Sequence, residues 1–313
     1  MKKTLIALAA VASLATSGAA FAQATISGGV GFASIKNLAG TSQGLLNTGA
    51  WLDVAASEDL GGGMKVSAFM ELNMDSSRAS AGSAYSGDRN MTLSTPSFSL
   101  TLANSRSGGN QAAALVAPVN LWDGVWGAGN VITRVNVDAA VLTVPMSGGL
   151  TLQGKYVESG TDYATSAGTT TMVAGAIYAA GPLKVAGFVN QSAFTPATLV
   201  ALAAAGVTTP RTVSTDLSVT YNAGIATVGL GYDSTRRAKQ DGTDDAAILA
   251  GVTVPMGKAS FGVNYGKRGN GSFNQVGAQY DLSKRTNVNL SFGNADTGTA
   301  QTNEYSLSLN HYF

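Results

Sequence analysis

Hydrophobic and polar residues alternate with a period of two along most of this chain, in pieces of about ten residues. The last piece places Tyr305, Leu307, Leu309, His311 and Phe313 on one face, and polar residues such as Ser306 and Asn310 on the other. The same alternation covers 135–141, 213–221, 261–265, 275–280 and 287–292. It predicts β-strands, each with one face in apolar surroundings.

The connections between these pieces switch regularly between short turns and mostly longer polar loops. The turns fall at 57–63, 95–97, 145–149, 181–182, 222–224, 255–258 and 281–284. The loops fall near 37–47, 74–88, 106–131, 158–170, 192–211, 235–244, 269–271 and 295–303. Seven turns and eight loops make fifteen connections and therefore sixteen strands. An even strand number with both chain ends on the periplasmic side is typical of bacterial outer-membrane barrels.

A membrane location is favoured over a soluble β-sandwich, whose strands alternate in the same way. Strands of about ten residues suit a tilted crossing of the hydrocarbon layer. In hydrocarbon every backbone amide needs a partner, which a closed sheet provides. Aromatic residues near strand ends match an interfacial girdle: Tyr221, Tyr232, Tyr265, Tyr280, Tyr305 and Phe313. We therefore predict an all-β fold, a 16-stranded antiparallel transmembrane β-barrel with short periplasmic turns and long external loops.

The first 22 residues have the pattern of a cleaved signal peptide. Lys2 and Lys3 precede an apolar core from Leu5 to Ala15, and Ala20 and Ala22 form an A-x-A cleavage site. The mature protein is then expected to begin at Gln23, with 23–313 as the barrel domain, and to be exported from the cytoplasm.

Composition excludes several kinds of chemistry. The chain has no cysteine and one histidine, and its 19 basic and 18 acidic residues give a net charge of +1. Disulfides, thiolate nucleophiles and zinc-thiolate sites are excluded, and nucleic-acid binding is not indicated because there is no basic excess. No glycine-rich phosphate-binding motif with a lysine is present. We expect no cofactor and no metal, and no enzyme. An outer-membrane barrel enzyme stays as an alternative, because a carboxylate dyad cannot be recognised from sequence.

Several motifs together resemble the Gram-negative general porins of β-proteobacterial type. They are Thr25–Gly28 in the first strand, Ser57–Lys65 around the second turn, Leu282–Thr286, and the ending Asn310–Phe313. The resemblance implies a homotrimeric, water-filled outer-membrane channel that passes small hydrophilic solutes passively. In that family the terminal Phe and the apolar positions behind it are recognised by the barrel-assembly machinery. Here those positions are Tyr305, Leu307, Leu309, His311 and Phe313.

The resemblance also implies an inward-folded third loop that narrows the pore, here Arg106–Val131 with Trp122 and Asp123. The arginines that family members place on the opposite wall are absent, since their positions hold Trp51, Ala55 and Asn104. The resemblance makes Trp51 and Arg106 pore candidates. By strand parity the lumen-facing charges are Asp53, Lys65, Glu71, Arg134, Asp138, Lys155 and Asp216. The signs nearly balance, so we predict weak selectivity, slightly favouring anions if Lys65, Arg106 and Arg134 converge.

Three further interpretations remain open at this point. As a sugar track, Trp51, Phe69 and Trp122 would make the protein a substrate-specific channel. Arg236, Arg237 and Lys239 in an external loop can meet lipopolysaccharide phosphates. Asp241–Asp245 offers oxygen ligands to a divalent cation but lacks the full calcium-loop pattern. Both loop clusters also fit simple solvated loops.

Overall fold

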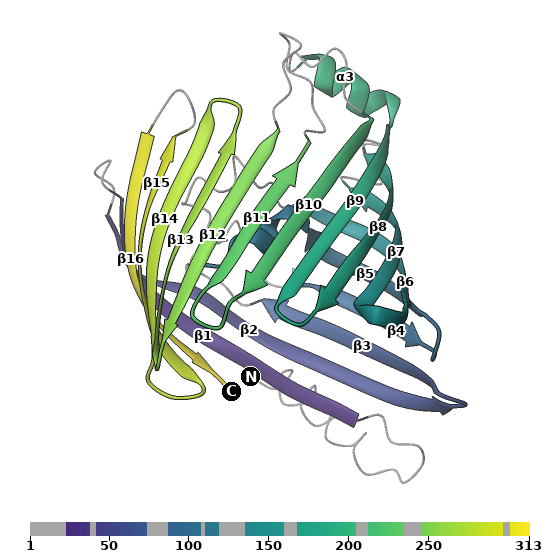
Figure 1. The fold of residues 1–313 in the computed structure, drawn as a ribbon, viewed down its shortest axis with the longest axis horizontal. Helices are drawn as coiled ribbons and strands as arrows, with labels where there is room; N and C mark the ends of the chain where they lie inside the picture. The colour runs from purple at the N-terminus through teal and green to yellow at the C-terminus, as the bar shows by residue number, and fades with distance from the viewer. Residues whose placement is uncertain are drawn as a thin grey trace, which may run out of the picture.

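The chain closes into a β-barrel (Figure 1). In this computed structural model the described residues are 23–37, 42–73, 87–107, 110–118, 135–159, 168–204, 212–234, 246–296 and 301–313. They form sixteen strands, each paired antiparallel with its neighbours in the order of the sequence, and β1 pairs with β16 to close the cylinder.

The strands have the following bounds. The first eight are β1 (Gln23–Asn37), β2 (Ser42–Gly61), β3 (Met64–Asn73), β4 (Arg89–Ser94), β5 (Ser99–Ser107), β6 (Val135–Pro145), β7 (Leu150–Ser159) and β8 (Thr169–Ala180). The others are β9 (Leu183–Phe194), β10 (Val213–Asn222), β11 (Thr227–Asp233), β12 (Ala247–Met256), β13 (Ala259–Arg268), β14 (Gly271–Asp281), β15 (Thr286–Asp296) and β16 (Gln301–Tyr312). The helical elements are η1 (Asn110–Ala114), η2 (Ser147–Gly149) and α3 (Pro196–Ala204). None of these helices is long and apolar enough to cross a membrane.

The predicted strand number and the predicted short turns are confirmed. All seven short turns lie where the sequence places them, for example at Gly62–Gly63 and Gly181–Pro182. On the opposite rim, the connection that the sequence places at 269–271 is a tight turn made by Gly269 and Asn270. Gly269 has a φ of +55°, a conformation that glycine adopts without steric cost.

The barrel closes at the C-terminal phenylalanine. The backbone N–H of Phe313 donates to the carbonyl of Gly28 at 3.0 Å, and the N–H of Gly28 donates back to the carbonyl of Phe313 at 3.1 Å. A Cβ on residue 28 would lie 2.8 Å from the Phe313 ring, so glycine leaves room for that ring at the seam.

Large apolar side chains cover the outward face of the wall from β10 to β16. Exposed outward residues include Leu217, Leu230, Val263, Leu290 and Leu307, at 50 % to 57 % exposure. The alternate positions face inward and are mostly polar, small or both, among them Ser218, Asn264 and Ser291. Tyr305, Leu307, Leu309, His311 and Phe313 share the outward face of β16 as the alternation indicates.

The predicted orientation of β6 is wrong. Asp138 pairs in register with Asn104, whose outward neighbour Leu102 is 48 % exposed, while Val137 is buried on the inward side. Asp138 therefore faces outward and does not line the lumen. The prediction assumed that the more apolar set of a strand always faces lipid, and β6 carries Val137 and Val141 on the inner face.

Candidate functional site

A segment of the loop after β5 lies inside the barrel. β5 ends at Ser107, and residues 110–118 lie against β10, β11 and β12, which are several strands away around the cylinder. The residues they touch, such as Gly229 and Gly251, alternate with the outward-facing Leu230 and Val252 and therefore face the lumen. The segment is visible in blue behind β10 and β11 in Figure 1. It crosses the lumen and narrows it.

Glycines on three consecutive strands make room for this segment. A Cβ added to Gly229 would lie 2.2 Å from the carbonyl oxygen of Ala114, and one added to Gly251 would lie 2.5 Å from the same atom. A Cβ on Gly262 would lie 2.7 Å from the Ala117 Cβ. Each distance is shorter than real Cβ contacts allow, so these three positions form a cradle that accepts the loop backbone directly.

Hydrogen bonds and apolar packing hold the segment in the cradle. The N–H of Ala117 donates to Asn264 Oδ1 at 3.1 Å, and the Thr253 hydroxyl donates to the carbonyl of Val116. Above the cradle, Ala114 and Leu115 join a small buried cluster inside the barrel, completed by Ala247, Leu249, Phe273 and Ala295. Both the polar groups of the loop backbone and its apolar side chains therefore have partners on one wall.

The opposite wall carries the residues predicted on β2 and β3. Asp53 and Glu71 are direct register partners on the inward face, and Lys65 shares the parity of Glu71 closer to the turn. The Trp51 ring lies over Gly29, where a Cβ would come within 2.7 Å of it. It also meets Tyr312 edge-on, with ring centroids 5.8 Å apart. Trp51 is thus packed along the wall at the β1–β16 seam.

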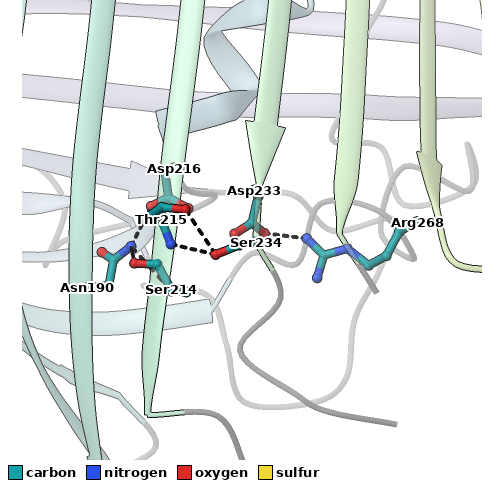
Figure 2. Close-up of polar contacts among 7 residues, drawn as sticks. All are labelled: Asn190, Ser214, Thr215, Asp216, Asp233, Ser234 and Arg268. Atoms are coloured by element: carbon teal, nitrogen blue, oxygen red, sulfur yellow. Dashed lines mark hydrogen bonds and ion pairs between the residues drawn. The ribbon is translucent and has the colours of Figure 1, made fainter. Parts of the chain in front are cut away.

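A ladder of charges follows the inner wall from β7 to β13. Lys155 lies 4.5 Å above the centre of the Phe188 ring and interacts electrostatically with Asp216. Asp216 accepts a hydrogen bond from Asn190 Nδ2 at 2.9 Å and is the register partner of Asp233 on β11. Arg268 on β13 reaches across β12 to Asp233 at 2.5 Å (Figure 2). Two basic groups therefore flank two adjacent carboxylates along this wall, and the four charges compensate one another.

The contact between Asp233 and Arg268 depends on the small side chain of the residue that lies between them. Ala247 is the register partner of both Asp233 and Arg268 and is completely buried. Its methyl group leaves the path across β12 open to the guanidinium. Asp233 and Asp216 are 6 % and 3 % exposed, so both carboxylates lie within the wall and are little presented to solutes.

The structure places only part of the predicted constriction. Trp51, Asp53, Lys65 and Glu71 lie on the inward face as predicted, while Asp138 does not. Trp122, Asp123 and Arg134, and the side chain of Arg106, lie outside the described residues, as do the loop clusters 236–239 and 241–245. Among the described residues no group of three or more histidine or acidic side chains could hold a metal ion.

Sequence reasoning missed the glycine cradle and the Asp233–Arg268 pair. A signal for the cradle does exist, because Gly229, Gly251 and Gly262 occur at inward positions of three successive strands. Glycine weakens strands, so three of them at one site indicate close approach of another backbone. No comparable signal marks Asp233, which directly follows Tyr232 at the end of its strand.

Comparisons with known proteins agree with this architecture. A family model described as Gram-negative porin matches residues 7–300. The anion-selective porin from Comamonas acidovorans is similar in structure, with a TM-score of 0.65, 19 % identity, and coverage of 93 % of this chain and 100 % of that one. A mutant porin of Rhodopseudomonas blastica has a TM-score of 0.65 and 13 % identity over the same shares. At 13 % to 19 % identity, the similarity to these two structures establishes a shared fold alone. No curated protein matches the chain.

Proposed function

Because the chain belongs to the Gram-negative porin family, which makes it an outer-membrane channel for passive diffusion, we propose that it is a weakly selective pore for small hydrophilic solutes. The observation that carries the proposal is the docked segment 110–118, which narrows one side of the lumen while the opposite wall keeps polar groups. A sixteen-stranded barrel is wide enough to leave an aqueous path beside such a segment. Solutes then move down their gradient, and no cofactor takes part.

Weak selectivity is supported by the presence of both signs among the inward charges. On the described strands the inward carboxylates include Asp53, Asp59, Glu71, Asp216, Asp233, Asp281 and Glu304, and the inward cations include Lys65, Lys155, Lys184 and Arg268. Strong ion selectivity needs a ring or cluster of one sign. The compensated ladder on β7–β13 argues against such a cluster. The anion preference stated for the Comamonas protein would require additional inward cations here.

The outward surface of β4–β7 supports assembly into a homotrimer. Arg89, Asn104, Asp138 and Glu158 are successive register partners on this face. Asn104 Nδ2 donates to Asp138 Oδ1 at 2.7 Å, and the Tyr156 hydroxyl donates to Glu158 at 2.6 Å. A hollow of about 500 Å³ opens among these residues, floored by Ala140 and Leu102.

This polar row lies within the height of the hydrocarbon band, where contact of its charges with lipid would be costly. From Thr95 to Arg89 the chain runs six residues, ~20 Å along a strand, and the height is smaller because strands tilt. The apolar band of a lipid-facing barrel is roughly 25 Å tall, and charges within it are costly. A neighbouring protomer that presents polar groups to this face removes that cost.

The remaining parts of the proposal follow from the sequence motifs. Residues 1–22 act as the cleaved export signal, with Ala20, Ala22 and Gln23 at the cleavage site. The outward face of β16 serves as the recognition signal for the barrel-assembly machinery, a form of strand recognition. Outer-membrane lipid surrounds β8–β16, and lipopolysaccharide meets the external loops. Catalysis is not part of this function.

Planar-bilayer recording of the purified protein tests the channel. We expect ohmic conductance steps and a reversal potential close to zero in a salt gradient. Silent bilayers would contradict the pore, and a large reversal potential would contradict weak selectivity. Blockade by one sugar at low concentration would favour the substrate-specific alternative.

The trimer has its own test. The double variant Asp138→Ala, Glu158→Ala should lower the temperature at which trimers dissociate in detergent. The matched control is Asn274→Ala, an outward polar residue on β14. Equal dissociation temperatures for both variants would remove β4–β7 from the contact.

A further inference from the structure

Helix α3 is an apolar helix that the barrel holds out at its external rim. Its nine residues, Pro196–Ala204, contain a single polar side chain, Thr198, and no charge. No residue of the helix is buried, and Val200 and Leu199 are 70 % and 42 % exposed. Figure 1 shows α3 beyond the ends of β8 and β9. A helix that is apolar on all sides belongs in an apolar environment.

Polar contacts fix the first turn of α3 to the rim. Thr195 caps the helix, with its hydroxyl accepting from the N–H of Thr198 at 3.3 Å. The Thr198 hydroxyl donates to the carbonyl of Gly168, just before β8, at 2.9 Å. The N–H of Gly168 donates to both threonine hydroxyls, at 3.2 and 2.9 Å. These bonds engage both threonines at the start of the helix, and none of the apolar residues that follow is buried.

The lipid-facing surface of the barrel continues up to this attachment point. Met172 on β8 is 60 % exposed on the outward face and lies four residues from Gly168, ~13 Å along the strand. Val213, the first residue of β10 after the helix-bearing loop, is also outward and 47 % exposed. The sequence has no charged residue between Lys184 and Arg211. The segment that carries the helix therefore has no charge of its own that would oppose contact with hydrocarbon.

We propose that α3 is an interfacial anchor whose apolar side chains enter the outer leaflet at the boundary between headgroups and acyl chains. A helix of nine residues is ~13 Å long, which is too short to cross the membrane. A helix of this length can lie in the plane of the boundary between headgroups and acyl chains. The anchor ties the β9–β10 loop to the lipid and away from the pore mouth. This inference rests on the outer-membrane location in the proposed function.

Site-directed fluorescence in vesicles tests the anchor. The chain has no cysteine, so Val200→Cys can be labelled specifically with a nitrobenzoxadiazole dye in the full-length protein, reconstituted in phosphatidylcholine vesicles. Leu230→Cys, outward on β11, reports the lipid-facing wall, and Asn270→Cys, exposed in the turn at the same rim, reports water. Heat-modifiable electrophoretic mobility confirms that each variant is folded.

We expect the dye at residue 200 to emit at shorter wavelength than the dye at residue 270, to be quenched by doxyl-labelled lipids, and to resist iodide. Emission and iodide quenching like those at residue 270 would overturn the anchor. Protection from both quenchers would also overturn it, in favour of a protein covering the helix. If the dye at residue 230 is not quenched by doxyl lipid, the membrane-embedded barrel itself fails, and the two failures are thereby distinguished.

Discussion

The glycine cradle permits a sharp test of the constriction. Replacing Gly229 by alanine places a Cβ 2.2 Å from the Ala114 carbonyl oxygen, whereas real contacts of this kind stay at or above 3.0 Å. The carbonyl must therefore retreat by at least 0.8 Å, the difference between the two distances. β11 is hydrogen-bonded on both sides, so the loop moves and the wall does not. Such overpacking costs about 1–3 kcal/mol.

A matched control exists on β7. Gly154 lies in an exposed strand position, and a Cβ there would meet nothing within 4 Å. Gly154→Ala is expected to be neutral or to stabilise by about 0.5–1 kcal/mol, because alanine loses less backbone entropy than glycine on folding. Comparing the two substitutions separates crowding at the cradle from the general effect of alanine in a strand.

Single-channel conductance of the purified variants is the assay. Because the wall holds the segment on one side, displacement carries residues 110–118 toward the open lumen. We expect Gly229→Ala to conduct less than the parent protein, the double variant Gly229→Ala, Gly251→Ala to conduct less still, and Gly154→Ala to be unchanged. Conductance equal to that of the control would refute the role of this segment in narrowing the pore. A higher conductance would refute its displacement as a docked unit.

Three further predictions concern the wall and the seam. Arg268→Met should lower the free energy of unfolding by about 3–5 kcal/mol, because it leaves the buried Asp233 carboxylate without its partner. Denaturant titration measures this loss, and the double variant with Asp233→Asn should recover part of the lost free energy. Gly28→Val should reduce the yield of heat-modifiable barrel, since the Phe313 ring already lies 2.8 Å from the added Cβ, and a normal yield would contradict tight closure there. Lys155→Met should shift the reversal potential toward cation permeation, whereas Lys155→Arg should leave it unchanged. Equal reversal potentials for the parent protein and Lys155→Met would show that Lys155 does not contribute to ion selectivity.

The case of β6 explains where strand parity fails. Parity predicts correctly which residues of a strand share a face, because successive side chains alternate. It does not say which of the two faces is outside. On β10–β16 the apolar set faces outward and the assignment holds. On β6 the outward residues include Asp138 as well as Ala140 and Leu142. The assumption that the more hydrophobic face of a strand contacts lipid therefore assigned the wrong face of β6 to the membrane.

The constriction shows a similar division. Trp51, Asp53, Lys65 and Glu71 could be placed on the inner wall from sequence because they lie on strands whose alternation and adjoining turn are clear. The wall that receives residues 110–118 could not be identified, because it lies more than a hundred residues further along the chain, at Gly229, Gly251 and Gly262. Local pattern carries no information on which distant strand faces a loop across the barrel.

The sequence by itself determined the class of this protein. Period-two alternation, a regular sequence of turns and loops, and a terminal phenylalanine are local features, and local hydrogen-bonding geometry converts them into sixteen paired strands. Only the tertiary structure decided what the pore contains. A loop docks on three glycines, and Arg268 extends over Ala247 to Asp233. Both contacts form because the folded barrel places residues that are far apart in the sequence at the same height of the wall. The alternation of residue types determines which side chains share one face of a strand. The hydrogen-bond register around the closed barrel determines which residues of other strands lie beside them.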